Sequence, residues 1–168
     1  MVYGVGAKGN LIPLIRAIQR GLPVWLPDFH NKRSMVDVND VVAAAVKLVE
    51  SPEAHGIYTV TDGETYSIGR ILHEIRMALG RRDPWITVPA WCFGLLAKMG
   101  DQIGKRRGKR FLFDSDKLAK LAGNAWFSSE RLTTELGFVP SRTLSDAIPG
   151  MIDALGTGQD GTNVTQKT

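Results

Sequence analysis

Apolar residues recur at helical and strand-like spacing over the first 80 residues of the chain. Helical spacing runs through residues 11–18 and again through residues 68–79. Short apolar runs predict strands at residues 33–38 and 56–67, and a helix between them ends before Pro52. Alternating strands and helices are typical of an α/β fold with parallel strands.

Capping residues predict where the helices begin and end. The predicted N-caps are Asn10, Asn39 or Asp40, Ser67 and Ser128, and the predicted ends are Gly21, Gly80 and Gly137. Thr143 and Asp146 have the spacing of a capping box at the start of the last helix. Pro149 and Gly150 are expected to kink or break that helix.

The predicted sheet has few strands, and its first strand covers only residues 1–3. Because a doubly wound sheet usually has about six strands, the sheet looks incomplete on its amino-terminal side. The second half of the chain is mainly helical, with an apolar helix in the region 91–104 and shorter helices at residues 115–123 and 128–137. We expect one folded unit over residues 1–155 and a disordered tail over residues 156–168, which lack apolar periodicity.

Composition adds limits to this picture. A chain of 168 residues with 43% hydrophobic and 23% charged residues can bury one substantial core. No apolar stretch reaches the length of a membrane span, and no signal-peptide pattern opens the chain, so we expect a cytoplasmic protein. Cys92 is the single cysteine, which excludes an intrachain disulfide and a cysteine-based zinc site.

The opening "MVYGVGAKGN" contains G-x-G-x-x-G at Gly4, Gly6 and Gly9. A dinucleotide fingerprint needs a full strand before it and an acidic residue about 20 positions later, at the end of another strand. Here the strand is short, and the acidic candidate Asp28 lies among prolines that a central strand does not tolerate. A plain turn, or a phosphate-binding turn before a helix reinforced by Lys8, fits better.

Five segments, in this order, resemble one known family: "MVYGVGAKGN", "GLPVWL", "NKRSMVDVNDVVAA", "GIYTVTDGETYSIGRI" and "SSERLTTELGFVPSRTLSDAI". They resemble the C-terminal half of the extended short-chain dehydrogenase/reductases, the NAD-dependent nucleotide-sugar epimerase/dehydratase family. The resemblance implies the C-terminal part of a Rossmann-type parallel sheet with a small, mainly helical substrate-binding lobe. It runs from residue 2 to about residue 155.

The resemblance also implies roles for individual residues. Asn10 and Arg33 match family positions that hold the diphosphate of a nucleotide-diphosphate sugar. Leu11 and Lys8, close to Asn10 in the sequence, are further substrate-binding candidates, and Tyr3 is the candidate for a cofactor contact. The three glycines then belong to the substrate side. Two positions depart from the family pattern: a common proline is Val5, and the acidic position after the strand is Asn39, followed by Asp40.

The catalytic pair of that family, Tyr-x-x-x-Lys, does not occur in this sequence. Tyr66 and Arg70 have its spacing, but arginine is a poor proton relay, so we interpret them as structural. The full-length relatives implied by the resemblance use NAD. We expect this chain alone to bind no NAD and to turn over no substrate.

A basic run, "KRRGKR" at residues 105–110, supports a competing hypothesis. A stand-alone, non-enzymatic module could bind an anionic surface through this run. Nucleic acid is not expected, because aromatic residues flank the run and do not alternate with its cations. If the chain is instead the C-terminal half of such an enzyme, its incomplete sheet exposes a strand edge, so we predict a homo-oligomer.

Overall fold

The computed structural model describes residues 1–7, 9–84, 88–89, 91–95, 119 and 122–156. Its elements, in chain order, are β1 (Val2–Tyr3), α1 (Leu11–Gln19), β2 (Val36–Asp37), α2 (Val38–Val49), α3 (Ile68–Ala78), α6 (Glu130–Leu136) and α7 (Leu144–Gly156). The mixed α/β arrangement agrees with the predicted fold class. No helix within the described ranges is long and apolar enough to cross a membrane.

The two strands form a parallel pair in which Val2 faces Val36 and Tyr3 faces Asp37. The predicted strand at residues 56–67 was wrong as a strand. It runs beside β2 but meets that segment through only a few backbone bonds, such as Asp62 N–H to the Met35 carbonyl at 2.8 Å. Gly63, with a φ of 82°, turns the chain between Asp62 and Tyr66, and this turn interrupts the ladder of backbone hydrogen bonds that a strand would form here.

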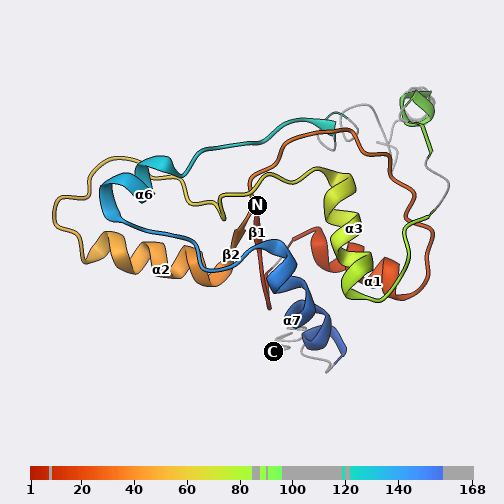
Figure 1. Ribbon diagram of the computed structural model, residues 1–168, viewed down its shortest axis with the longest axis horizontal. Helices are drawn as coiled ribbons and strands as arrows, with labels where there is room; N and C mark the ends of the chain where they lie inside the picture. Colours follow the sequence, from red (N-terminus) through yellow and green to blue (C-terminus); the bar gives the residue numbers. More distant parts are fainter. Residues whose placement is uncertain (8, 85–87, 90, 96–118, 120–121, 157–168) are drawn as a thin grey trace, which may run out of the picture.

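The core lies on one side of the strand pair, where α1, α3 and α7 pack together (Figure 1). Helix α3 follows the prediction closely: the Ser67 hydroxyl accepts from the Arg70 N–H at 3.1 Å, and the predicted apolar stripe is its buried face. Helix α1 ends as predicted at Gly21, whose φ is 76°. Helix α2 reaches away from this core, toward α6 (Figure 1).

Three predicted helix features were wrong in detail. Helix α2 is capped by Asp37, whose carboxylate accepts from the Asn39 N–H at 2.7 Å, and not by Asn39 or Asp40. Helix α7 runs through Pro149 without the break that was one of the two predicted outcomes; its buried face packs against α3, and this packing holds the helix together while Pro149 faces solvent.

The helix at residues 128–137 has Ser129 at its N-cap position, although the Ser128 hydroxyl does accept from the Glu130 N–H at 3.1 Å. At the start of α7 the Asp146 carboxylate accepts from the Thr143 N–H at 2.9 Å, as in a capping box, and also from the Thr143 hydroxyl at 2.7 Å. The helix predicted at residues 115–123, the tail beyond Gly156 and the basic run at residues 105–110 lie wholly or mostly outside the described residues.

Candidate functional site

The glycine-rich turn connects the end of β1 to the start of α1. Gly4 has a φ of 127°, and a β-carbon there would lie 2.8 Å from Cγ1 of Val38, so only glycine fits. The turn is closed by a bond from the Ala7 N–H to the Gly4 carbonyl at 3.2 Å. It then folds back, since a β-carbon on Gly9 would lie 3.9 Å from the carbonyl oxygen of Val2. Helix α1 therefore starts beside β1.

Asn10 occupies the N-cap position of α1, but its side chain makes no capping hydrogen bond. Its backbone already has helical dihedral angles, φ −73° and ψ −10°, whereas a capping residue usually has an extended backbone. At this end of α1, the Leu14 N–H donates to the Asn10 carbonyl at 3.4 Å. The first N–H groups of a helix have no acceptor within the helix, and they favour a negatively charged ligand. The Leu11 side chain itself is buried in the core.

Arg33 lies three residues before β2 and is half-buried. Its backbone exchanges two hydrogen bonds with Tyr66, at 3.0 and 2.9 Å, and it also forms a parallel bridge with Ala125. The following residue, Ser34, is bonded on the same side to Ala125 and Phe127. The backbone of Arg33 is thus fixed from two directions.

The starts of α1 and of β2 lie at the same end of the strand pair. Val36 faces Val2, and Val2 lies beside Gly9. Arg33, three residues before Val36, and Asn10, next to Gly9, are thus both close in sequence to residues at this end of the strand pair. Lys8 lies outside the described residues. The substrate-binding roles of Asn10, Leu11, Arg33 and Lys8 stay predictions.

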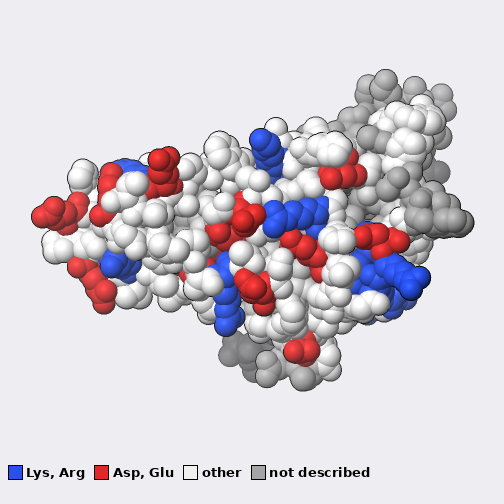
Figure 2. Space-filling view, viewed as in Figure 1, with Lys and Arg blue, Asp and Glu red and all other residues white. Residues whose placement is uncertain are grey.

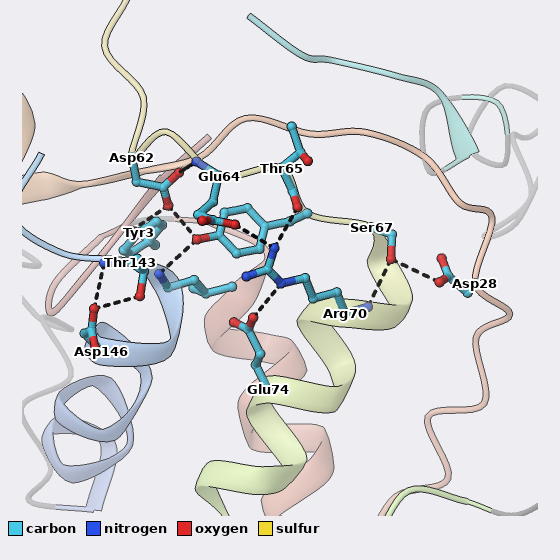
Figure 3. Close-up of polar contacts among 12 residues, drawn as sticks. Tyr3, Asp28, Asp62, Glu64, Thr65, Ser67, Arg70, Glu74, Thr143 and Asp146 are labelled. Carbon is cyan, nitrogen blue, oxygen red and sulfur yellow. Dashed lines mark hydrogen bonds and ion pairs between the residues drawn. The ribbon is translucent and has the colours of Figure 1, made fainter. Parts of the chain in front are cut away.

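Tyr3 belongs to a buried polar cluster. Its hydroxyl donates to Oδ2 of Asp62 at 2.8 Å, and the Tyr66 hydroxyl donates to the same oxygen at 2.8 Å (Figure 3). Burial raises the pKa of the Asp62 carboxyl and the pKa values of both phenols. The cofactor contact predicted for Tyr3 stays a prediction. The structure shows its hydroxyl facing Asp62 and the carbonyl of Arg142.

Tyr66 and Arg70 have structural contacts. The Arg70 guanidinium lies 4.7 Å from the centre of the Tyr66 ring and pairs with Glu64 at 2.9 Å and Glu74 at 2.8 Å (Figure 3). A catalytic phenol needs a lowered pKa, whereas burial raises the pKa of Tyr66. These contacts agree with the structural interpretation of this pair.

Sequence reasoning missed the role of Asp40. Its buried carboxylate accepts from the Ser141 N–H at 3.0 Å, from the Ser141 hydroxyl at 2.6 Å and from the Arg142 N–H at 3.3 Å. These bonds tie the segment before α7 to the start of α2. The adjacent polar residues Asn39 and Asp40 were the available sequence signal. The residue that Asp40 binds, Ser141, lies 101 positions away.

Two cavities lie near α3. One, of about 240 Å³, is lined by Trp25, Asp28, Gly69 and the His73–Asp83 pair. The other, of about 280 Å³, lies at the far end of α1 and is lined by Trp25 and three arginines, Arg76, Arg81 and Arg82. Basic side chains gather over this end of α1, whereas the rest of the visible face mixes both signs of charge (Figure 2). Among the residues that the structure describes, no cluster of side chains could hold a metal ion.

The strand pair, the turn and the helices together define an α/β protein in which α1 begins directly after a glycine-rich turn. The chain is similar to UDP-glucose 4-epimerase of Vibrio cholerae, with 30% identity over 148 residues that make up 87% of this chain and 42% of that protein. It is also similar to N-acetyl-alpha-D-glucosaminyl-diphospho-ditrans,octacis-undecaprenol 4-epimerase of Escherichia coli O157:H7, with 22% identity over 88% of this chain and 45% of that protein.

Among solved structures, the Bordetella bronchiseptica enzyme WbmG in complex with NAD and UDP shares the fold. Its TM-score is 0.63 at 18% identity, over 93% of this chain and 42% of that one. No protein-family model matches the chain. The chain is homologous to these sugar 4-epimerases, which confirms the resemblance found in the sequence, and it spans less than half the length of the curated relatives that it matches.

Proposed function

We propose that this chain is the substrate-side part of an NAD-dependent nucleotide-sugar epimerase or dehydratase, and that it binds a nucleotide-diphosphate sugar. The observation that carries the proposal is the start of α1, which follows the glycine-rich turn directly, lies beside β1 and has at its N-cap position an Asn10 side chain that makes no capping hydrogen bond. The homology to UDP-glucose 4-epimerase supports the choice of ligand.

The binding chemistry follows from the donors. A diphosphate carries several acceptor oxygens and negative charge, which suit the N–H groups and the positive dipole end of a helix. The Arg33 guanidinium would add a charged donor from the β2 side. Each such charge-assisted bond contributes about 1.5–3 kcal/mol. In this arrangement the chain binds and orients the substrate without moving a proton.

The described residues do not fit NAD. The turn contains three glycines, but Gly9 precedes α1, whereas a fingerprint has its third glycine within the helix. Asp28, the acidic candidate, is bonded to the Ser67 hydroxyl at 3.1 Å and to the His30 N–H at 2.9 Å. We therefore derive no step through NAD in this chain. In a full-length enzyme of this family, NAD supplies the hydride chemistry.

Isothermal titration of the chain with UDP-glucose tests the proposal. We expect measurable binding, weakened about 10- to 100-fold by Arg33→Ala or Asn10→Ala, because each removes one donor to the diphosphate. Lys47→Ala, at an exposed position on α2, is the control and should bind as the unchanged chain does.

Two results would overturn the proposal. One is the absence of UDP-glucose binding by a folded chain. The other is polyanion binding that falls steeply with salt and disappears on charge reversal at Arg106 and Arg107, which would favour the anionic-surface module.

We also propose that the chain alone forms a homo-oligomer through its open sheet edge. Apart from β2, no strand of the described chain pairs with β1. Unpaired backbone groups on an edge strand readily pair with another chain. A strictly monomeric species at tens of micromolar by light scattering would contradict this.

A further inference from the structure

Helices α1 and α3 end side by side, and each is followed by a glycine with a left-handed backbone. Gly21 after α1 has a φ of 76°, and Gly80 after α3 has a φ of 64°. The N–H of the next residue, Leu22 or Arg81, donates to a carbonyl in the last turn of its own helix, at 3.0 and 2.8 Å respectively. This is the Schellman arrangement of a helix end. It fixes the backbone of Leu22 and of Arg81.

Arginine side chains join the two helix ends. The Arg81 guanidinium donates to the Gln19 carbonyl at 2.7 Å, and its other terminal nitrogen would lie 3.5 Å from a β-carbon on Gly21. The negative end of a helix dipole favours a cation, which accounts for Arg81. Arg20 and Arg82, next to these residues in the sequence, are exposed. They add positive charge at this end of α1, where basic side chains gather in Figure 2.

A cavity of about 280 Å³ lies between the helix ends, and Leu22, Trp25, Arg81 and Arg82 are among the residues that line it. Leu22 is 56% exposed and Trp25 is 49% exposed. In a Schellman motif the residue after the glycine frequently packs against its own helix, whereas much of Leu22 stays in solvent. Two large apolar side chains thus stay exposed among cations. We call residues 20, 22, 25, 81 and 82 the helix-end surface.

The acidic side chain next to this surface is already compensated. Asp83 follows Arg82 and pairs with Arg76 at 3.2 Å and also with His73. The Arg76 guanidinium donates in addition to the Val24 carbonyl at 2.6 Å, so Arg76 is held by the fold. The positive charge of the exposed arginines is therefore available to an external anion.

We propose that the helix-end surface binds the surface of a membrane that contains anionic phospholipids. The arginines would contact lipid phosphates at the cavity, and Leu22 and Trp25 would enter the headgroup layer. Tryptophan and leucine beside basic side chains are typical of proteins that lie on a bilayer. Each arginine near an anionic bilayer adds to the attraction. The contact is peripheral, and it does not rest on the proposed function, which uses the opposite end of α1.

The apolar residues favour a membrane over nucleic acid. A single-stranded nucleic acid is bound by several aromatic side chains along a basic groove, on which successive bases stack. The helix-end surface has one aromatic residue, Trp25, and its second apolar residue is an aliphatic leucine. An aliphatic side chain gives no stacking platform, but it is well suited to lipid acyl chains.

Co-sedimentation with vesicles tests the proposal. The chain would be mixed with vesicles of equal parts phosphatidylcholine and phosphatidylglycerol, or of phosphatidylcholine alone. We expect binding to the anionic vesicles only, and less binding as salt is added. Arg20→Glu and Arg82→Glu should each weaken this binding at least about tenfold. Lys47→Glu, at an exposed position on α2, makes the same change of charge and should have little effect.

The apolar contribution has its own matched pair of variants. Trp25→Ser should weaken binding to the anionic vesicles several-fold, because the indole no longer enters the headgroup layer. Trp126→Ser is the control, since Trp126 is 56% exposed and lies outside the helix-end surface. Circular dichroism of every variant shows whether the fold is kept.

Four results would overturn the inference. One is the absence of anionic-vesicle binding by the folded chain. Another is equal loss with Arg82→Glu and Lys47→Glu, which would indicate an effect of net charge alone. A third is binding that resists both arginine changes but disappears on charge reversal at Arg106 and Arg107. The fourth is unchanged vesicle binding by Trp25→Ser with complete displacement by free glycerol phosphate, which would indicate a site for a soluble phosphate. The UDP-glucose titration is independent of all four, so either proposal can fail alone.

Discussion

The buried tyrosine cluster makes a prediction in which two similar substitutions have different effects. Tyr3 and Tyr66 both donate to Oδ2 of Asp62, each at 2.8 Å. Only the Tyr66 hydroxyl also accepts a hydrogen bond, from the Leu144 N–H at 3.2 Å at the start of α7. Tyr66→Phe is therefore expected to destabilise the protein more than Tyr3→Phe.

The magnitudes follow from the bonds lost. Tyr3→Phe removes one hydrogen bond to a charged acceptor, worth about 1.5–3 kcal/mol, together with the longer contact that the same O–H shares with the Arg142 carbonyl at 3.1 Å. Tyr66→Phe removes an equivalent bond and also leaves the Leu144 N–H buried without a partner, which adds about 1–3 kcal/mol. We expect a total of roughly 3–5 kcal/mol for Tyr66→Phe. In the double variant, the Asp62 carboxylate loses both phenol bonds and keeps the bond from the Glu64 N–H. The double variant should therefore lose more unfolding free energy than the two single variants lose together.

Urea unfolding followed by circular dichroism measures these differences, at one fixed protein concentration because self-association would shift the midpoint. Tyr58→Phe is the control. The Tyr58 hydroxyl also donates to a carboxylate, Glu135 at 2.7 Å, but at the surface, so its loss should change the midpoint little. The reasoning is refuted if Tyr3→Phe costs as much as Tyr66→Phe, or if Tyr58→Phe costs as much as either.

Three further predictions concern single side chains. Because burial raises the pKa of Asp62, the contribution of its carboxyl to stability is largest below the ordinary aspartate pKa of 3.8 and falls as pH rises through the raised value. In urea titrations the stability of the unchanged chain relative to Asp62→Asn should therefore decline between pH 3 and 7. A rise over this range would contradict a pKa raised by burial. Gly150→Ala should raise the unfolding free energy by about 0.5–1 kcal/mol, since a β-carbon there meets nothing within 4 Å, whereas Gly137→Ala, at a φ of 60°, should lower it by about 1–2 kcal/mol. Asp40→Ala should cost roughly 2–4 kcal/mol by thermal or urea unfolding and Asp40→Asn less, because the amide oxygen still accepts from Ser141.

The elements predicted most accurately are those fixed by local signals. The stripe, cap and end of α3 lie within 14 residues of one another, and all three are present in the structure. The start of α2 was misplaced because Asp37 both ends β2 and caps the helix, and the apolar pattern alone does not separate these two roles. The segment at residues 56–67 has the alternation of a strand, yet the Asp62 side chain turns inward to two tyrosines.

The contacts that define the site depend on distant partners. Tyr3 meets Asp62 across 59 positions and the Arg142 carbonyl across 139 positions. No periodicity in a single sequence contains that information. Arg33 could be named only through the resemblance to a family, whereas Asn10 also follows from the predicted turn and helix start. What the structure adds is the position of the start of α1 beside β1 and the fixed backbone of Arg33.

The glycine pattern at the start of the chain is explained by packing and turn geometry without any dinucleotide. Gly4 is required because Val38, at the start of α2, lies where a β-carbon would project, and Gly6 because its φ is 79°. Neither reason applies to Gly9, because the atom nearest to a β-carbon built there is the Val2 carbonyl oxygen at 3.9 Å, an ordinary contact distance. In a true fingerprint the third glycine is required by close packing of helix and strand. Substitution to alanine should therefore be tolerated at Gly9 and destabilising at Gly4, the reverse of what close packing at the third position demands.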